Sequence, residues 1–327
     1  MLPDAKVVDV LLIDVLVGAD MTLSINSIYR LALRVCIICV GVCVSGLTPS
    51  GSPVTSPSTL DLQVLADFPA NTSLLCPAAC QCSVIQSSSG SAGRTAAACD
   101  KPIHDDDRFD PETEAVHVTG NCHRSFASVL AAAGTLAAPR DLWLRRCHLY
   151  TVEDLLTAGD AVNWGTVFEL DVGFNLVTRV HARAFVRMSS LRTLVLTHNR
   201  IESIDRNAFE GLSDLARLDL AGNRMSMVTR IDMRWLCALG SLLELSLRDN
   251  GVHVLAASAF LCRPTPCPLQ RLDLGGNRIR RVEQDAFVGL TNITRLKIDA
   301  SQLTTVPVMA LLRLSRSLEE LDMSRDR

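Results

Sequence analysis

Aromatic residues are scarce in this sequence of 327 residues, where they make up 4% and include three tryptophans and two tyrosines. Because hydrophobic residues still amount to 48%, we expect aliphatic side chains to fill the core. The formal net charge is −3, so the basic excess of nucleic-acid-binding proteins is missing. Glycine-rich phosphate loops, Gly-x-Ser-x-Gly elbows and His-Glu-x-x-His motifs are also missing. These absences predict a protein with no enzymatic activity, no cofactor, no resident metal and no nucleic-acid partner.

Long apolar runs are missing too, apart from a short one near the N-terminus. Two arginines precede an apolar stretch from Val35 to Val44, and small residues follow up to Gly46. This order is typical of a secretory signal, and the stretch is too short to span a bilayer comfortably. We therefore expect residues 1–46 to be a signal region, with Met21 as an alternative start. The Ser-, Thr- and Pro-rich residues 47–75 then form a flexible lead-in.

What the sequence does contain is a repeat with the template L-x-x-L-x-L-x-x-N-x-L, whose copies start 24 to 28 residues apart. This spacing is that of leucine-rich repeats. The pattern predicts an α/β leucine-rich-repeat solenoid, or horseshoe, with about nine repeats over residues 113–327, the last of them truncated. A parallel β-sheet should form its concave face, and irregular, 3-10 or short helical segments its convex face.

One position of the template is an asparagine, which we expect to lie in the buried turn after each strand. Its amide can both donate and accept hydrogen bonds, so stacked asparagines can bond their own turn and the next repeat. The predicted ladder consists of Asn175, Asn199, Asn223, Asn250 and Asn277. Cys147, Ser301 and Asp326 occupy the same position in other repeats. The convex-side phenylalanines (Phe185, Phe209, Phe260 and Phe287) are most simply core residues, and an aromatic recognition stripe is the alternative.

The residues between the strand leucines should face outward from the concave sheet at fixed spacing. A rigid, varied surface of this kind suits the binding of a protein ligand or a glycan, although many such residues can simply be solvated. The candidates are Glu169, Asp171, Arg217, Asp219, Glu244, Arg248, Arg271, Asp273, Arg295 and Lys297.

Cysteines before the first repeat resemble the N-terminal cap of extracellular leucine-rich-repeat proteins, in the pattern C-x3-C-x-C-x(n)-C. The resemblance implies that Cys76 pairs with Cys82 and that Cys80 pairs with Cys99. We therefore define residues 76–112 as a cysteine cap and loop. Zinc ligation is the alternative for this spacing, but a secretory route favours disulfides.

The later cysteines leave several pairings open. Cys122 and Cys147 end neighbouring strands and can form a disulfide, remain buried thiols, or join His123 and His148 in a zinc site. Cys237 can pair with Cys262 or with Cys267 across an insertion. The acidic stretch from His104 to Asp110 is interpreted as a solvated loop rather than a metal site. Sequons at Asn71 and Asn292 predict N-glycosylation.

Three features of this chain resemble the N-terminal part of an insect-type Toll receptor ectodomain. They are the strands ending in TGNCH and LRRCH, the loop VNWGTVFELD, and WLCALGSLLELSLRDN followed by CPLQRLDLGGNRI. The resemblance implies a cell-surface receptor of innate immunity that binds a protein ligand or a partner receptor, or dimerises with a like chain. The concave face or a flank would carry the contact. The alternative is a secreted or surface-anchored adhesion or matrix protein without a signalling tail.

Overall fold

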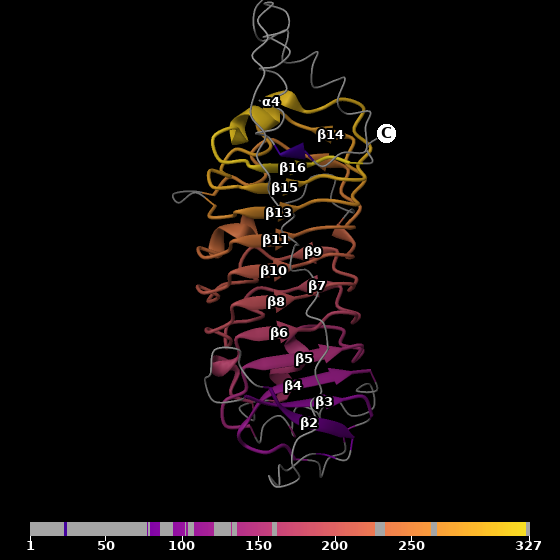
Figure 1. Cartoon of the computed structure of the whole chain (residues 1–327), viewed down its shortest axis with the longest axis vertical. Helices are drawn as coiled ribbons and strands as arrows, with labels where there is room; N and C mark the ends of the chain where they lie inside the picture. The colour runs from indigo at the N-terminus through magenta and orange to yellow at the C-terminus, as the bar shows by residue number, and fades with distance from the viewer. Residues whose placement is uncertain are drawn as a thin grey trace, which may run out of the picture.

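The computed structural model describes residues 23–24, 77, 79–85, 94–101, 103, 108–120, 132, 136–158, 162–225, 233–262 and 267–324. Within these residues the chain forms an elongated stack in which each turn adds one strand above the last (Figure 1). Apart from Leu23 and Ser24, the predicted signal and lead-in lie outside the described residues, as do Cys76, Cys122, His123, Asn71 and Asp326.

The alternating leucines place one strand of each repeat in a common sheet, as the period of two requires. Among the described residues this sheet has 12 strands, in the order β1-β16-β15-β13-β11-β10-β8-β6-β5-β4-β3-β2. Pairing is parallel from β3 to β16 and antiparallel at the two ends, where β2 meets β3 and β1 meets β16. The strands are β1 (Leu23–Ser24), β2 (Cys80–Ile85), β3 (Arg94–Cys99), β4 (Thr113–Thr119), β5 (Asp141–Arg145), β6 (Glu169–Asp171), β8 (Thr193–Val195), β10 (Arg217–Asp219), β11 (Glu244–Ser246), β13 (Arg271–Asp273), β15 (Arg295–Lys297) and β16 (Glu320–Asp322).

The rest of each turn is made of short segments, as the repeat predicts. Two pairs of two-residue strands lie beyond the ladder turns: β7 (Arg179–Val180) with β9 (Ser203–Ile204), and β12 (Val254–Leu255) with β14 (Arg281–Val282). The helical segments are η2 (Glu153–Ala158), η3 (Trp164–Thr166), η5 (Arg234–Ala238), α4 (Val308–Leu311) and η6 (Leu312–Leu314). The leucine-rich-repeat solenoid with a parallel sheet and few helices is confirmed.

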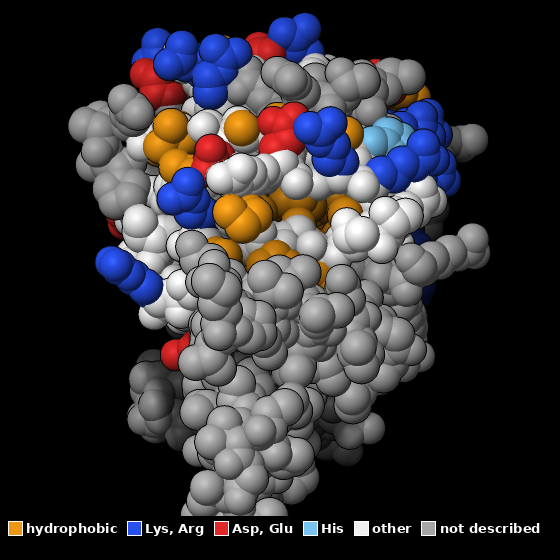
Figure 2. Space-filling view, turned by 90° about the horizontal axis from the view of Figure 1, so that it is seen from above, with side chains coloured by type: hydrophobic (Ala, Val, Ile, Leu, Met, Phe, Trp, Pro, Cys, Tyr) orange, Lys and Arg blue, Asp and Glu red, His pale blue; other side chains and the backbone are white. Residues whose placement is uncertain are grey.

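The core runs along the axis between these two sides. Seen from the C-terminal end, hydrophobic side chains lie in the middle of the coloured part, with charged side chains above them and on both sides (Figure 2). Phe185, Phe209, Phe260 and Phe287 are at most 1% exposed. Phe185 and Phe209 stack with centroids 5.8 Å apart, and Phe260 and Phe287 with centroids 6.2 Å apart. These rings are core residues, so the recognition-stripe alternative is wrong.

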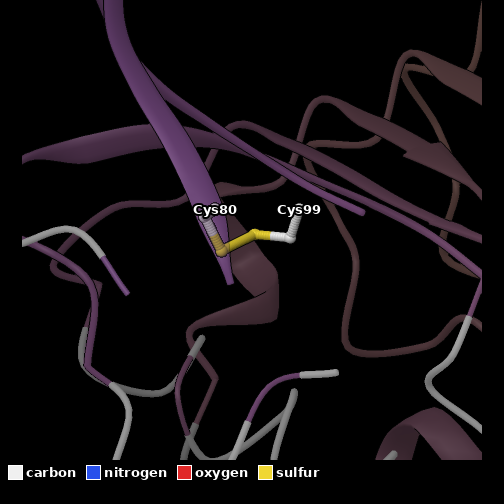
Figure 3. The surroundings of a disulfide bond; sticks show 2 residues. All are labelled: Cys80 and Cys99. Atoms are coloured by element: carbon white, nitrogen blue, oxygen red, sulfur yellow. A yellow bond between two sulfur atoms is a disulfide. The ribbon is translucent and has the colours of Figure 1, made fainter. Parts of the chain in front are cut away.

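A disulfide-bonded hairpin covers the N-terminal end of the stack. Strands β2 and β3 pair antiparallel with Cys80 directly opposite Cys99, and the two residues form the predicted disulfide (Figure 3). Cys82 is also disulfide-bonded. Because Cys76 lies outside the described residues, the Cys76–Cys82 pairing stays a prediction. Strand β3 then pairs parallel with β4, so the hairpin continues the sheet and protects its first repeat.

The cysteines further along the chain settle two of the open alternatives. Cys237, in η5, is bonded to Cys262, and the prediction that Cys267 takes part in a disulfide is wrong. Cys267 is a buried thiol that forms a backbone bridge with Leu290 at the approach to β13, away from the convex turns that carry the bonded pair. Burial raises the pKa of this thiol. Cys147 is disulfide-bonded, which excludes the zinc alternative for its sulfur.

The asparagine ladder forms as expected, with one correction of direction. In Asn199, Nδ2 donates to its own turn at Leu196 O (3.1 Å) and to Val172 O (3.0 Å), and Oδ1 accepts from Val177 N (3.1 Å). The partner is therefore the preceding repeat and not the next. All five ladder asparagines are at most 6% exposed.

Candidate functional site

The outward side chains of the concave sheet form three columns, because the strands pair in register from repeat to repeat. The first column contains Asp141, Glu169, Thr193, Arg217, Glu244, Arg271, Arg295 and Glu320. The second contains His117, Trp143, Asp171, Val195, Asp219, Ser246, Asp273, Lys297 and Asp322. The third follows the strand ends and includes Arg145, Arg248 and Asp299. Neighbours in a column lie about 4.8 Å apart, which is close enough for adjacent side chains to interact.

Stacked rings dominate the N-terminal strands. His117 on β4 and Trp143 on β5 stack with centroids 3.8 Å apart and planes inclined by 9°. The Arg145 guanidinium lies 5.0 Å from the Trp143 ring, and Trp143 Nε1 donates to Glu169 Oε1 at 2.9 Å. Burial, with the positive charge of Arg145, lowers the pKa of His117 to about 4. The imidazole is therefore neutral at physiological pH.

The two margins of these strands carry similar stacks. At the strand starts, the Phe168 ring lies between the guanidinium groups of Arg140 (4.5 Å) and Arg192 (5.1 Å). At the strand ends, the Phe174 and His198 rings stack at 4.5 Å, with Arg146 5.3 Å from Phe174. Such cation–ring contacts stabilise by about 0.5–1 kcal/mol each at exposed positions. These contacts restrict the rings, although Phe174 remains 40% exposed.

Ion pairs replace the rings on the C-terminal strands. Glu244 on β11 is flanked in its column by Arg217 and Arg271 and forms ion pairs with both. Burial alone would raise the pKa of Glu244, but the hydrogen bonds and charges of the two arginines outweigh it and lower that pKa. Arg295 pairs with Glu320 at 3.1 Å in the same column.

One ion pair in the third column crosses a whole repeat. Arg248 Nη1 and Nη2 bond Asp299 Oδ1 and Oδ2 at 3.0 and 3.1 Å, although 51 residues separate them in sequence. Gly275, in the intervening repeat, lies directly under the pair, and a Cβ there would collide with both side chains. The absence of a side chain at Gly275 therefore allows a bidentate pair between repeats that are not neighbours.

The second column contains carboxylates that accept hydrogen bonds from the turns that follow their strands. Asp219 Oδ1 accepts from Ala221 N at 3.0 Å, and Asp273 Oδ1 accepts from Gly275 N at 2.8 Å. Burial raises the pKa of both carboxyl groups against these bonds. Burial and the charge of Asp141 likewise raise the pKa of Glu169.

The predicted concave residues lie on one face, with one correction. Asp171 is 1% exposed and forms an ion pair with Arg145, so it is a buried support and not a recognition side chain. Its Oδ1 also accepts from Gly173 N at 2.8 Å. The sequence-based candidates omitted His117, Trp143 and Arg145. The pattern Leu-Trp-Leu-Arg in β5 contained the signal, because it has the same alternation as the later strands.

Among the residues that the structure describes, no group of three or more His, Cys, Asp or Glu side chains is placed to hold a metal ion. No helix in the described part of the chain has the length and apolarity needed to cross a membrane.

A model of the family "Leucine rich repeat" matches residues 166–225 and 267–327. The fold is a leucine-rich-repeat solenoid. Among solved structures, a chain of the Drosophila Toll–Spätzle complex matches this leucine-rich-repeat protein with a TM-score of 0.54 and 15% identity, over 66% of this chain and 30% of that one. A chain of the mouse RP105/MD-1 complex matches with a TM-score of 0.50 and 19% identity, over 62% and 33%. At these identities the likeness concerns the fold.

Two curated proteins are similar in sequence to this leucine-rich-repeat chain. Mouse Tsukushi is 30% identical over 176 residues, which cover 47% of this chain and 49% of Tsukushi. Human leucine-rich repeats and immunoglobulin-like domains protein 1 is 38% identical over 170 residues, covering 52% of this chain and 14% of the human protein. The chain therefore spans about half of one relative and a small part of the other.

Proposed function

We propose that this chain is a non-enzymatic, extracellular recognition module of a Toll-like cell-surface receptor, and that its concave sheet binds a protein ligand or a partner receptor. The observation that carries the proposal is the register of that sheet. It fixes charged and aromatic side chains in columns from β4 to β16, with stacks and ion pairs that hold them in place. A surface ordered before binding loses little conformational entropy on association.

The disulfides support the extracellular part of the proposal. Cys80–Cys99 and Cys237–Cys262 are formed, and such bonds persist in oxidising compartments. Asn292 is exposed at the bend before β15, so its sequon is accessible for the predicted N-glycosylation. The likeness to a chain of the Toll–Spätzle complex supports the receptor part.

A binding measurement tests which face is used. Spätzle and MD-1, the proteins named with the matched chains, are the probes for the purified full-length chain in biolayer interferometry. We expect one of them to bind, and Arg295→Glu with Lys297→Glu on the exposed positions of β15 to weaken it at least tenfold, about 1.4 kcal/mol. Arg206→Glu with Arg316→Glu, at exposed convex positions, is the control with the same charge change. Binding of neither probe, or equal loss in both variants, contradicts the proposal.

The alternative function is a secreted or surface-anchored adhesion or matrix protein. It is favoured by the sequence relatives, neither of which is named as a Toll receptor. Sequencing the transcript beyond the codon for Arg327 separates the two. A membrane span followed by a TIR-like domain supports the receptor, whereas a cysteine cap followed by a stop codon supports the alternative.

A further inference from the structure

We propose a second binding site on this chain, on the flank formed by the ladder turns, for a linear acidic polysaccharide such as a sulfated glycosaminoglycan. The site borders the concave sheet along its strand ends and does not rest on the function proposed above. We define the ladder flank as the residues one before, one after and three after each ladder position from Cys147 to Ser301.

The ladder flank is basic although the whole chain carries a net charge of −3. Its exposed arginines are Arg146, Arg200, Arg224, Arg278 and Arg280, against two carboxylates, Glu202 and Asp249. Among the described residues, Arg200, Arg224 and Arg278 have no ion-pair partner, in contrast to the arginines of the concave columns. Parallel stacking keeps the flank in register, since Arg224 N donates to Ile201 O, and Arg280 N to His253 O. Exposed guanidinium groups at repeat spacing attract a polyanion.

A polar hollow of about 290 Å³ interrupts this row of arginines. Gly251 takes the place where neighbouring repeats carry Arg224 and Arg278, and the missing side chain opens the space between those two arginines. The two guanidinium-bearing repeats lie on either side of the Gly251 repeat, so about 10 Å separates them. The lining also includes Asp249, Asn250, His253 and Gly276.

A buried acceptor without a partner lines the hollow. Asn250 is 1% exposed, and its Oδ1 has no hydrogen-bond partner. In the other rungs this oxygen accepts the N–H two residues after the preceding ladder position, for example Val252 N to Asn277 Oδ1 at 3.0 Å. The equivalent N–H, that of Met225, does not reach Asn250. A buried acceptor in this state destabilises its turn, and a small rotation of the Asn250 side chain towards the hollow would let a ligand hydroxyl donate to it.

The remaining groups define the chemistry of the ligand. The Asp249 carboxylate, held 3.6 Å from Arg248, lies over the backbone of Gly276 and offers further acceptor oxygens. His253 Nδ1 donates to Arg278 O at 3.3 Å, so the Nδ1 proton is already used within the protein. The site therefore needs hydroxyl donors at its centre and anions on both sides. An acidic sugar carries both on one ring, whereas an acidic peptide separates its N–H donors from its carboxylates by a side chain.

The test measures binding of a heparin octasaccharide to the purified full-length protein in 150 mM NaCl. We expect Arg224→Ala with Arg278→Ala to weaken binding about tenfold. Arg206→Ala with Arg316→Ala, at exposed convex positions, removes the same charge and should change binding less than twofold. The Arg224/Arg278 variant should also keep the wild-type affinity for whichever of Spätzle and MD-1 binds the concave face, so the two proposals fail separately. No binding of the octasaccharide, or equal loss in both variants, overturns the site.

A second measurement separates sugar recognition from charge attraction. A fully O-sulfated octasaccharide has more anions but no hydroxyl donors for Asn250 and Asp249, so we expect it to bind more weakly than the natural chain. A deca-glutamate peptide, a ten-nucleotide thymidine strand and phosphatidylserine vesicles should bind more weakly still. Tighter binding of the oversulfated chain, or equal binding of any of these three, overturns the proposal of a sugar site.

Discussion

The outward side chains of the concave sheet interact differently in its two halves, through stacked rings on the N-terminal strands and through ion pairs on the C-terminal strands. On β4, β5 and β6 and at their margins, rings are enclosed by guanidinium and imidazole groups, as in the stack of His117 and Trp143. On β10, β11 and β13 the same columns hold the alternating charges of Arg217, Glu244 and Arg271. Stacks remove apolar surface from water and depend little on salt, whereas exposed ion pairs are screened. The N-terminal half should therefore contribute more to the unfolding free energy. The contribution of the C-terminal half should depend on the salt concentration.

The largest expected difference between the halves is in their response to acid. The pKa of His117 is about 4 in the folded protein against an ordinary value of 6.5, so the unfolded chain binds the extra proton between these pH values. The contribution of the neutral His117 ring to the unfolding free energy is complete above about pH 6.5. As the pH falls towards 4 the unfolding free energy decreases by up to about 3 kcal/mol. We expect His117→Phe, which keeps a ring against Trp143, to flatten urea-derived unfolding free energies between pH 6.5 and 4.

The control for this measurement is His181→Gln, at an exposed histidine outside the concave sheet. It should keep the wild-type pH profile. An unchanged profile in His117→Phe would show that the C-terminal carboxylates, and not the N-terminal stack, determine the acid response.

The next largest effect concerns the stack itself. Trp143→Ala removes the contacts with His117 and Arg145 and the hydrogen bond to Glu169, so we expect a loss of about 2–3 kcal/mol in unfolding free energy. Trp143→Phe retains a stacking ring and should lose less than half as much. Urea denaturation followed by circular dichroism gives both values. A Trp143→Ala loss no larger than that of Glu244→Gln would break the proposed contrast between the halves.

The smallest effect is expected on the ion-paired strands. The side chains of Arg217, Glu244 and Arg271 are 57%, 27% and 43% exposed, so Glu244→Gln should cost less than about 1 kcal/mol at low salt. In 1 M NaCl the difference from wild type should vanish. Arg248→Ala, at the bidentate pair with Asp299, should retain part of its cost in salt because Asp299 is 7% exposed. Salt-independent loss in Glu244→Gln would argue against a screened network.

Much of this architecture follows from local sequence, because each copy of the template repeats the same strand, turn and asparagine. Leu194, Asn199 and Phe209 are predictable for that reason. The Cys80–Cys99 disulfide is implied instead by the resemblance of the cysteine pattern to a known N-terminal cap. The interactions between repeats are harder to predict. The Arg248–Asp299 pair depends on a glycine in a third repeat. The missing hydrogen bond of Asn250 Oδ1 depends on the position of the Met225 N–H in the preceding repeat. Both require the alignment of repeats of unequal length, which the template does not specify.

The Cys237–Cys262 disulfide affects how the solenoid unfolds, because the solenoid is a linear chain of coupled repeats. In such a chain, cooperative unfolding depends on each interface between neighbouring repeats. The interface between the Asn223 and Asn250 repeats lacks one ladder hydrogen bond, and among the described rings the convex contacts stop at Trp235 and resume at Phe260. The disulfide joins these same two repeats. A covalent bond thus links two repeats whose ladder contact is incomplete, and we expect its reduction to let the solenoid unfold as two blocks instead of one.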